Sequence, residues 1–196
     1  MKKFLACFML LIAVAACTSE APTRPIGPFT LDYSKLGKIT FAVEKMEFMN
    51  RVTPSVDAAY FENFKPQFTD VVYRWGVDRL QAGGGKGRAI LVIHDANITR
   101  EKMHRSTGVN SWFTREQSEK WSAQVAADIR VEGAAGNFNG SATAKASRFT
   151  TLLEDATEAE KQGAYRKMIT GLMDDLNAEL ERSIREHLNP AVLTMP

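Results

Sequence analysis

The sequence contains few of the residues from which catalytic and metal sites are commonly built. Its 196 residues include two cysteines and three histidines. Two cysteines are too few for a disulfide framework or a cysteine-rich zinc module. The histidines, His94, His104 and His187, show no metal-ligand spacing, and neither an HExxH nor a GxSxG pattern occurs. The sequence therefore predicts no metal, no cofactor and no enzyme activity. The one alternative is an acid–base pair formed by the adjacent His94 and Asp95.

A strong charge of either sign is also missing. The chain has 25 Lys and Arg against 23 Asp and Glu. Lys2 and Lys3 lie in a segment that we expect to be removed, and without them the count is 23 against 23. Nucleic-acid binding requires a basic surface, so we expect no nucleic-acid partner. A hydrophobic share of 44% with 24% charged residues is typical of a folded globular domain.

The chain has one long apolar run, and this run is too short to span a bilayer. Phe4 to Ala16 is apolar, follows Lys2 and Lys3, and falls well short of the roughly 20 residues that a membrane helix needs. This arrangement is typical of a signal peptide. The sequence Val14-Ala15-Ala16-Cys17 resembles the bacterial lipobox. That resemblance implies a diacylglyceryl group on the Cys17 thiol, cleavage before Cys17 and acylation of the new amino group. A plain secretory signal cut after Ala16 is the alternative.

These features divide the chain into three parts. We expect a signal peptide over residues 1–16, a lipidated cysteine with a flexible tether over 17–36, and a single periplasmic domain over 37–190. Pro22, Pro25 and Pro28 favour an extended chain in the tether. Bacterial lipoproteins with Asp after the lipidated cysteine stay in the inner membrane, and this chain has Thr18 there. We therefore expect the lipid on Cys17 to hold the protein at the cell outer membrane, facing the periplasm.

Hydrophobic periodicity predicts the elements of the domain. Alternating apolar residues indicate strands, and apolar residues three and four apart indicate helices. Thr157 and Glu160 form a capping-box pattern at the start of the last helix. We expect an α+β fold with a mainly antiparallel sheet of about four strands and two helices packed on one face. The predicted order is a strand at 38–48, a helix at 67–82, a strand at 89–93 whose extension through residue 98 is left open, a hairpin of strands at 123–132 and 141–149, and a helix at 158–188.

Two further segments contain residue types that also occur in binding sites. Trp112 and Phe113 lie in the polar stretch 100–118. Two interpretations are open: the rings contact a partner or the membrane interface, or they form a small cluster that holds the loop on the sheet. Residues 82–88, with the sequence AGGGKGR, do not match the phosphate-loop pattern and predict a turn.

Residues 38–188 resemble an uncharacterised family of proteobacterial envelope lipoproteins. The resemblance lies in Asp70 to Trp75 with Asp78-Arg79-Leu80, in Ala89 to Ala96, and in Leu176 to Arg182. The order of elements is more loosely similar to YajG-like lipoproteins and to auxiliary lipoproteins of ABC-type transport or of lipopolysaccharide (LPS) assembly. The resemblance implies an envelope lipoprotein and carries over no catalytic or binding residue.

The sequence thus predicts a non-catalytic accessory or binding subunit in envelope transport or assembly, with an envelope protein as its partner. The alternative is a small-molecule or lipid-binding lipoprotein of the periplasm, with an apolar cleft between the sheet and the helices.

Overall fold

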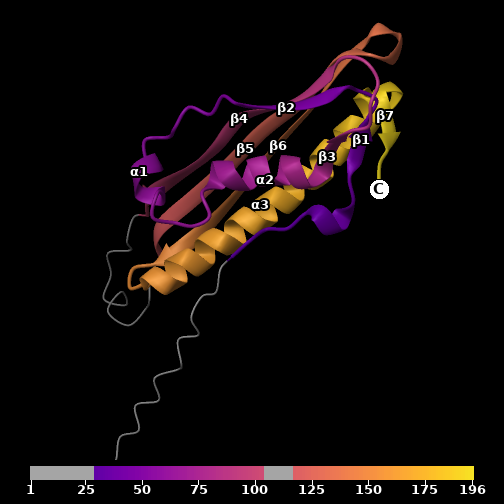
Figure 1. The fold of residues 1–196 in the computed structure, drawn as a ribbon. Helices are drawn as coiled ribbons and strands as arrows, with labels where there is room; N and C mark the ends of the chain where they lie inside the picture. The colour runs from indigo at the N-terminus through magenta and orange to yellow at the C-terminus, as the bar shows by residue number, and fades with distance from the viewer. Residues whose placement is uncertain (1–28, 104–116) are drawn as a thin grey trace, which may run out of the picture.

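A long antiparallel hairpin and a long helix beside it set the dimensions of the fold (Figure 1). The computed structural model describes residues 29–103 and 117–196. The hairpin consists of β5 (Gln117–Ala134) and β6 (Phe138–Leu153), and the helix α3 (Glu158–His187) runs back along it. The signal segment, the lipobox residues Val14 to Cys17, and Trp112 with Phe113 lie outside the described residues.

The main sheet has four strands in the order β2-β4-β5-β6. Strand β4 (Arg88–Lys102) pairs antiparallel with β5, and β5 pairs antiparallel with β6. Strand β2 (Lys45–Asn50) pairs parallel with β4, so the sheet is mixed. The parallel pair arises because the helix α2 (Phe68–Arg79) lies between these strands in the chain and forms the crossover that a parallel connection requires.

A second, three-stranded sheet was not expected from the sequence. It has the order β3-β1-β7 and consists of β1 (Ile39–Phe41), β3 (Leu80–Ala82) and β7 (Val192–Thr194). The β1–β3 pair is parallel and the β1–β7 pair is antiparallel. The prediction of a single, mainly antiparallel sheet of about four strands is therefore corrected to an α+β fold with two mixed sheets.

The strand predicted at 38–48 is two strands that belong to different sheets. The chain leaves β1 after Phe41 and enters β2 at Lys45. The alternation of apolar residues shifts by one position between Val43 and Met46. This shift marks the place where the chain passes from one sheet to the other, because one extra residue turns every following side chain to the opposite face.

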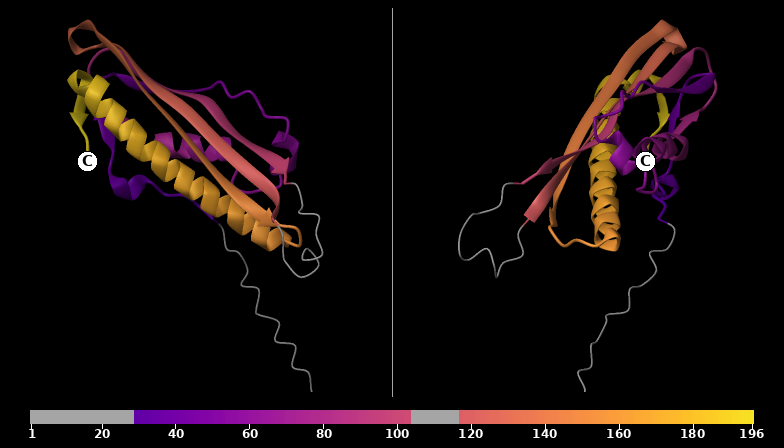
Figure 2. Two further views of the ribbon diagram at one scale, coloured as in Figure 1. Left: turned by 180° about the vertical axis from the view of Figure 1, so that it is seen from behind. Right: turned by 90° about the vertical axis from the view of Figure 1, so that its left-hand side faces the viewer.

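Both long helices cover the same face of the main sheet, as predicted (Figure 2). Helix α2 (Phe68–Arg79) ends three residues earlier than expected because Leu80 to Ala82 pair with β1 instead. Helix α3 has the predicted capping box, in which Thr157 and Glu160 hydrogen-bond to each other's main-chain N–H group. No helix within the described residues is long and apolar enough to cross a membrane.

The core lies between this sheet face and the two helices. Leu91, Ile129 and Ala144 point inward from three neighbouring strands and are buried. Leu172, Met173 and Leu176 of α3 face them and are also completely buried. At about 25 cal/mol per Å² of buried apolar surface, this interface is the main source of stability. Next to this core a small apolar cavity remains between β4 and the helices, lined by Ala96, Phe68 and Tyr165.

The glycine-rich segment forms a turn, as expected, but it connects two strands. Residues 83–87 lead from β3 to β4. Gly87 has a φ of 79°, and a Cβ atom there would collide with the main-chain oxygen of Glu132. Glycine is required at this position because of both the backbone conformation and the close approach of the neighbouring strand.

Residues on both sides of the expected domain boundaries pack against the domain. In the segment assigned to the tether, Tyr33 is buried, and its hydroxyl donates to the Asp174 carboxylate at 3.4 Å. Burial raises the pKa of Tyr33 well above its usual value. At the other end, Ala191 is buried and β7 completes the small sheet. The folded unit therefore begins before residue 37 and extends beyond residue 190.

Candidate binding site on the open sheet face

The face of the main sheet opposite the helices is uncovered by any described element (Figure 2). Side chains on this face follow the alternation of the strands and form rows across them. Arg130 of β5 pairs with Ser141 of β6, and Asp128 pairs with Thr143. Ala126 pairs with Lys145, and Gln124 pairs with Ser147. These rows surround a shallow hollow of about 780 Å³.

A buried carboxylate lies at the floor of this hollow. The Asp128 side chain is 6% exposed. One of its oxygens contacts Nε2 of His94, and the other accepts a hydrogen bond from Nε of Arg130 at 2.6 Å. An uncompensated charge at such a position would cost several kcal/mol. The imidazole and the guanidinium, both partly exposed, compensate it and fix its orientation.

His94 reaches Asp128 because of an irregularity in β4. The register between β4 and β5 shifts between Ile93 and Asp95, so His94 is an extra residue between two paired positions. Asp95, its sequence neighbour, instead accepts a hydrogen bond from the Asn97 amide at 2.8 Å. The acid–base pair that the sequence left open for His94 and Asp95 is therefore replaced by a pair of His94 and Asp128.

The β6 side of the hollow carries polar groups that bond to nothing else in the described chain. They are the side chains of Ser141, Thr143, Lys145 and Ser147, and Gln124 of β5 joins them. All five side chains are exposed. Hydroxyl and amide groups both donate and accept hydrogen bonds, whereas the Lys145 ammonium only donates. The hollow thus combines one tightly bonded set of charges with a row of available hydrogen-bonding groups.

Ion pairs neutralise the adjoining part of the same face. Arg88 donates to Glu132 at 2.8 Å and to Glu47 at 3.3 Å, and Lys45 pairs with Glu47 at 2.7 Å. The hydrogen bond from Lys45 lowers the pKa of the Glu47 carboxyl, and the hydrogen bond to Glu132 raises the pKa of Arg88. These exposed pairs contribute little to stability, but they leave this surface without a strong net charge.

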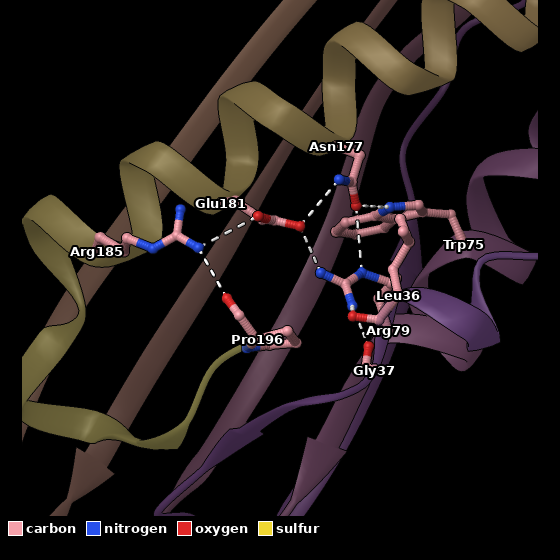
Figure 3. A network of polar contacts seen from close by, with 8 residues as sticks. All are labelled: Leu36, Gly37, Trp75, Arg79, Asn177, Glu181, Arg185 and Pro196. Carbon is pink, nitrogen blue, oxygen red and sulfur yellow. Dashed lines mark hydrogen bonds and ion pairs between the residues drawn. The ribbon is translucent and has the colours of Figure 1, made fainter.

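Arg79 forms the most buried polar network, which lies on the covered side of the sheet (Figure 3). Its guanidinium donates to Glu181 at 2.5 Å, to Asn177 at 3.2 Å and to the main-chain oxygens of Leu36 and Gly37. Trp75 Nε1 donates to the same Asn177 oxygen at 2.9 Å. These contacts join α2, α3 and the entering chain. Arg79 has no exposed surface with which to meet a ligand, so its role is structural.

A second cavity, of about 220 Å³, lies under the segment between β2 and α2. Phe61, Phe68 and Tyr165 line its apolar part. This volume is below the range of about 300–1,000 Å³ that ligand pockets usually have. Within residues 29–103 and 117–196, no three His, Cys, Asp or Glu side chains gather closely enough to hold a metal ion.

The sequence identified the open face only in part. The alternation in β5 predicted that Gln124, Ala126, Asp128 and Arg130 share one face, and the structure confirms it. The hollow itself was missed, because the shift at His94 and the burial of Asp128 have no signal in the sequence. The other predicted site residues lie outside the described residues, so their roles stay predictions. They are the lipidated Cys17, the signal-peptidase recognition residues Val14, Ala15 and Ala16, and the possible partner contacts Trp112 and Phe113.

The sequence matches no protein-family model and no curated protein. Its structure has distant similarity to solved structures. One is a neuraminyllactose-binding hemagglutinin homolog from Helicobacter pylori, with 8% identity, a TM-score of 0.40, and coverage of 70% of this chain and 80% of that one. A minor lipoprotein from Acinetobacter baumannii has 12% identity, a TM-score of 0.35, and coverage of 80% and 99%.

Rare lipoprotein B from Shewanella oneidensis has 12% identity, a TM-score of 0.29, and coverage of 73% of this chain and 92% of that one. Two of these three proteins are thus named as lipoproteins. At such TM-scores and identities the similarity carries no argument about family or function. The resemblance to envelope lipoproteins, including the YajG-like and LPS-assembly types, therefore stays a prediction from the sequence.

Proposed function

We propose that the protein is a lipid-anchored, non-catalytic binding subunit of the bacterial cell envelope, held at the outer membrane and facing the periplasm. The observation that carries the binding role is the uncovered sheet face, where a polar hollow surrounds the buried carboxylate of Asp128. The anchor rests on the apolar N-terminal run followed by Val14-Ala15-Ala16-Cys17.

The bonding of His94 supports a role without catalysis. A serine or threonine nucleophile is activated by a base within hydrogen-bond reach of its hydroxyl. Within the described residues, the imidazole of His94 bonds to Asp128 and to no hydroxyl. No preformed pair of a hydroxyl nucleophile and this imidazole is therefore present among the described residues.

The proposed anchor leaves the domain close to the membrane but free of it. Twelve residue steps separate Cys17 from Phe29, where the described chain begins. At about 3.5 Å per residue, this segment spans at most roughly 40 Å. One acyl chain gives only marginal attachment, whereas two or more give stable anchoring, so no membrane-inserting surface is required of the domain.

Metabolic labelling tests the anchor. We expect radiolabelled palmitate to enter the wild-type protein and to be absent from the Cys17→Ala variant, because the thiol is the group that receives the lipid. The Cys7→Ala variant is the matched control, since Cys7 lies in the segment that is removed, and it should be labelled like the wild type. Equal labelling of the Cys17→Ala variant, or no labelling of the wild type, would contradict the proposal.

An envelope protein partner is the second part of the proposal, and the anchored position of the domain supports it. We expect cross-linking in intact cells to join the full chain to a larger envelope complex. The Cys17→Ala variant, which is not held at the membrane, should lose this product. Recovery of the monomer alone, under conditions that capture known envelope complexes, would rule out a stable partner.

The alternative of a lipid-binding protein has less support. The space between the sheet and α3 is filled by side chains, and the apolar cavity near Tyr165 is small. The hollow on the open face is larger and polar, so it suits a polar small molecule better than the apolar cavity suits a lipid.

A further inference from the structure

The geometry points to the hollow on the open face of the main sheet as a saccharide-binding site, which takes a neutral or singly carboxylated oligosaccharide. This inference rests on the proposed binding function and names its ligand class. It follows from the charges that line the hollow, from the hydrogen-bonding groups that remain available there, and from one exposed ring beside them.

The charges in the hollow argue against a highly charged ligand. Arg130 and Lys145 are matched by Asp128 and Asp95 among the lining residues. A polyanion would meet the two carboxylates, and a polycation would meet the guanidinium and the ammonium. Of these four charged side chains, only Lys145 lacks a partner within the described chain, so the hollow has room for one additional negative group.

The available polar groups argue for a ligand rich in hydroxyls. Ser141, Thr143 and Ser147 lie on the same face of β6, with about 7 Å between the first two and about 13 Å between the last two along the strand. Gln124 lies opposite Ser147 and adds an amide. A sugar hydroxyl donates one hydrogen bond and accepts others, and these side chains can do both. Aliphatic ligands would bury such groups without partners, at a cost of about 1–3 kcal/mol for each.

An exposed aromatic ring extends the same row. Phe149 is the next outward residue of β6 after Ser147, and it is 68% exposed. The Lys120 ammonium lies 5.1 Å from its ring centroid. An exposed aromatic ring next to hydrogen-bonding groups suits a ligand with both an apolar face and polar edges, and a pyranose ring has both.

Substitution at the centre of the hollow gives the sharpest test. The Thr143 side chain is exposed and lies opposite Asp128, so Thr143→Tyr fills the hollow without entering the core. Lys145→Gln removes the unpaired charge and keeps hydrogen-bonding capacity. Lys167→Gln is the matched control, because Lys167 is an exposed lysine of α3 without a partner in the described chain.

The measurement uses the full chain in a detergent that has no sugar head group. An array of neutral, singly carboxylated and polysulfated oligosaccharides is probed first, and the best neutral and carboxylated ligands are then titrated by calorimetry. We expect saturable binding to a neutral or a carboxylated saccharide, weakened roughly tenfold or more by Thr143→Tyr. Lys145→Gln should weaken the carboxylated ligand several-fold more than the neutral one, and Lys167→Gln should change neither.

Three results would overturn the inference. They are the absence of saturable binding to any saccharide, a preference for the polysulfated ligands, and unchanged affinity in the Thr143→Tyr variant. None of them depends on lipidation, because the array reports binding and palmitate labelling reports the anchor. A protein that is labelled at Cys17 but binds no saccharide would retain its proposed place in the envelope and lose this ligand class.

Discussion

Replacement of Arg79 by alanine should lower the free energy of unfolding by about 3–5 kcal/mol. The guanidinium of Arg79 is completely buried and bonds to Glu181, Asn177 and two main-chain oxygens (Figure 3). The substitution would leave the Glu181 carboxylate without its buried partner and the oxygens of Leu36 and Gly37 without donors. Urea denaturation followed by tryptophan fluorescence measures the change.

Arg185 provides the matched control for this network. Its guanidinium lies 3.3 Å from the other oxygen of Glu181 and donates to the main-chain oxygen of Pro196 at 3.0 Å, but it is exposed. Arg185→Ala should therefore lower the free energy of unfolding by less than about 1 kcal/mol. If the two substitutions lowered the free energy of unfolding equally, the burial of Arg79 would not be the reason for its contribution to stability.

Replacement of Trp121 by alanine should lower the free energy of unfolding by a similar amount, about 3–5 kcal/mol. Trp121 of β5 is completely buried, and the rings of Tyr60, Phe61 and Phe64 pack against it with centroid distances of 5.1 to 5.9 Å. These rings hold the segment between β2 and α2 on the sheet. Urea denaturation should show the lower free energy of unfolding. Amide hydrogen exchange should become faster in residues 58–64, because this segment loses the ring on which it packs.

Phe149 is the aromatic control for Trp121. It lies on the open face of β6 and is largely exposed. Phe149→Ala should change the free energy of unfolding by no more than about 0.5 kcal/mol. A large effect at Phe149 with a small one at Trp121 would contradict the assignment of the core to the helix-covered face.

The elements with strong local signals were predictable from the sequence. Helix α3 has a capping box at Thr157 and an unbroken apolar stripe from Tyr165 to Leu188, and both appear in the structure. The hairpin of β5 and β6 follows from strict alternation on both sides of a turn. In these segments local preference and tertiary packing agree, so the pattern alone determines the element.

The strands of the small sheet were not predictable in the same way. β1, β3 and β7 have three residues each, which is too short for a period to appear. Leu80 to Ala82 continue the helical spacing of α2, but pairing with β1 gives them an extended conformation. Such pairing depends on residues about forty positions apart, and no local pattern reports it.

The candidate site was predictable as a polar face but not as a hollow. Alternation places Asp128 and Arg130 on the outward side of β5, where the sequence leaves open both a solvated surface and a contact with a partner. The register shift at His94 brings an imidazole to Asp128 and allows the carboxylate to be buried. A shift of one residue between two strands depends on the pairing itself, so it cannot be read from either strand alone.

We propose that fatty chains on Cys17 anchor an α+β binding domain to the envelope. Mass spectrometry of the N-terminal peptide, from protein purified out of bacterial membranes, tests it most directly. We expect a chain that begins at Cys17 and carries a diacylglyceryl thioether together with an acylated amino group. A chain that begins at Cys17 with a free thiol, or that retains Met1 to Ala16, would contradict it.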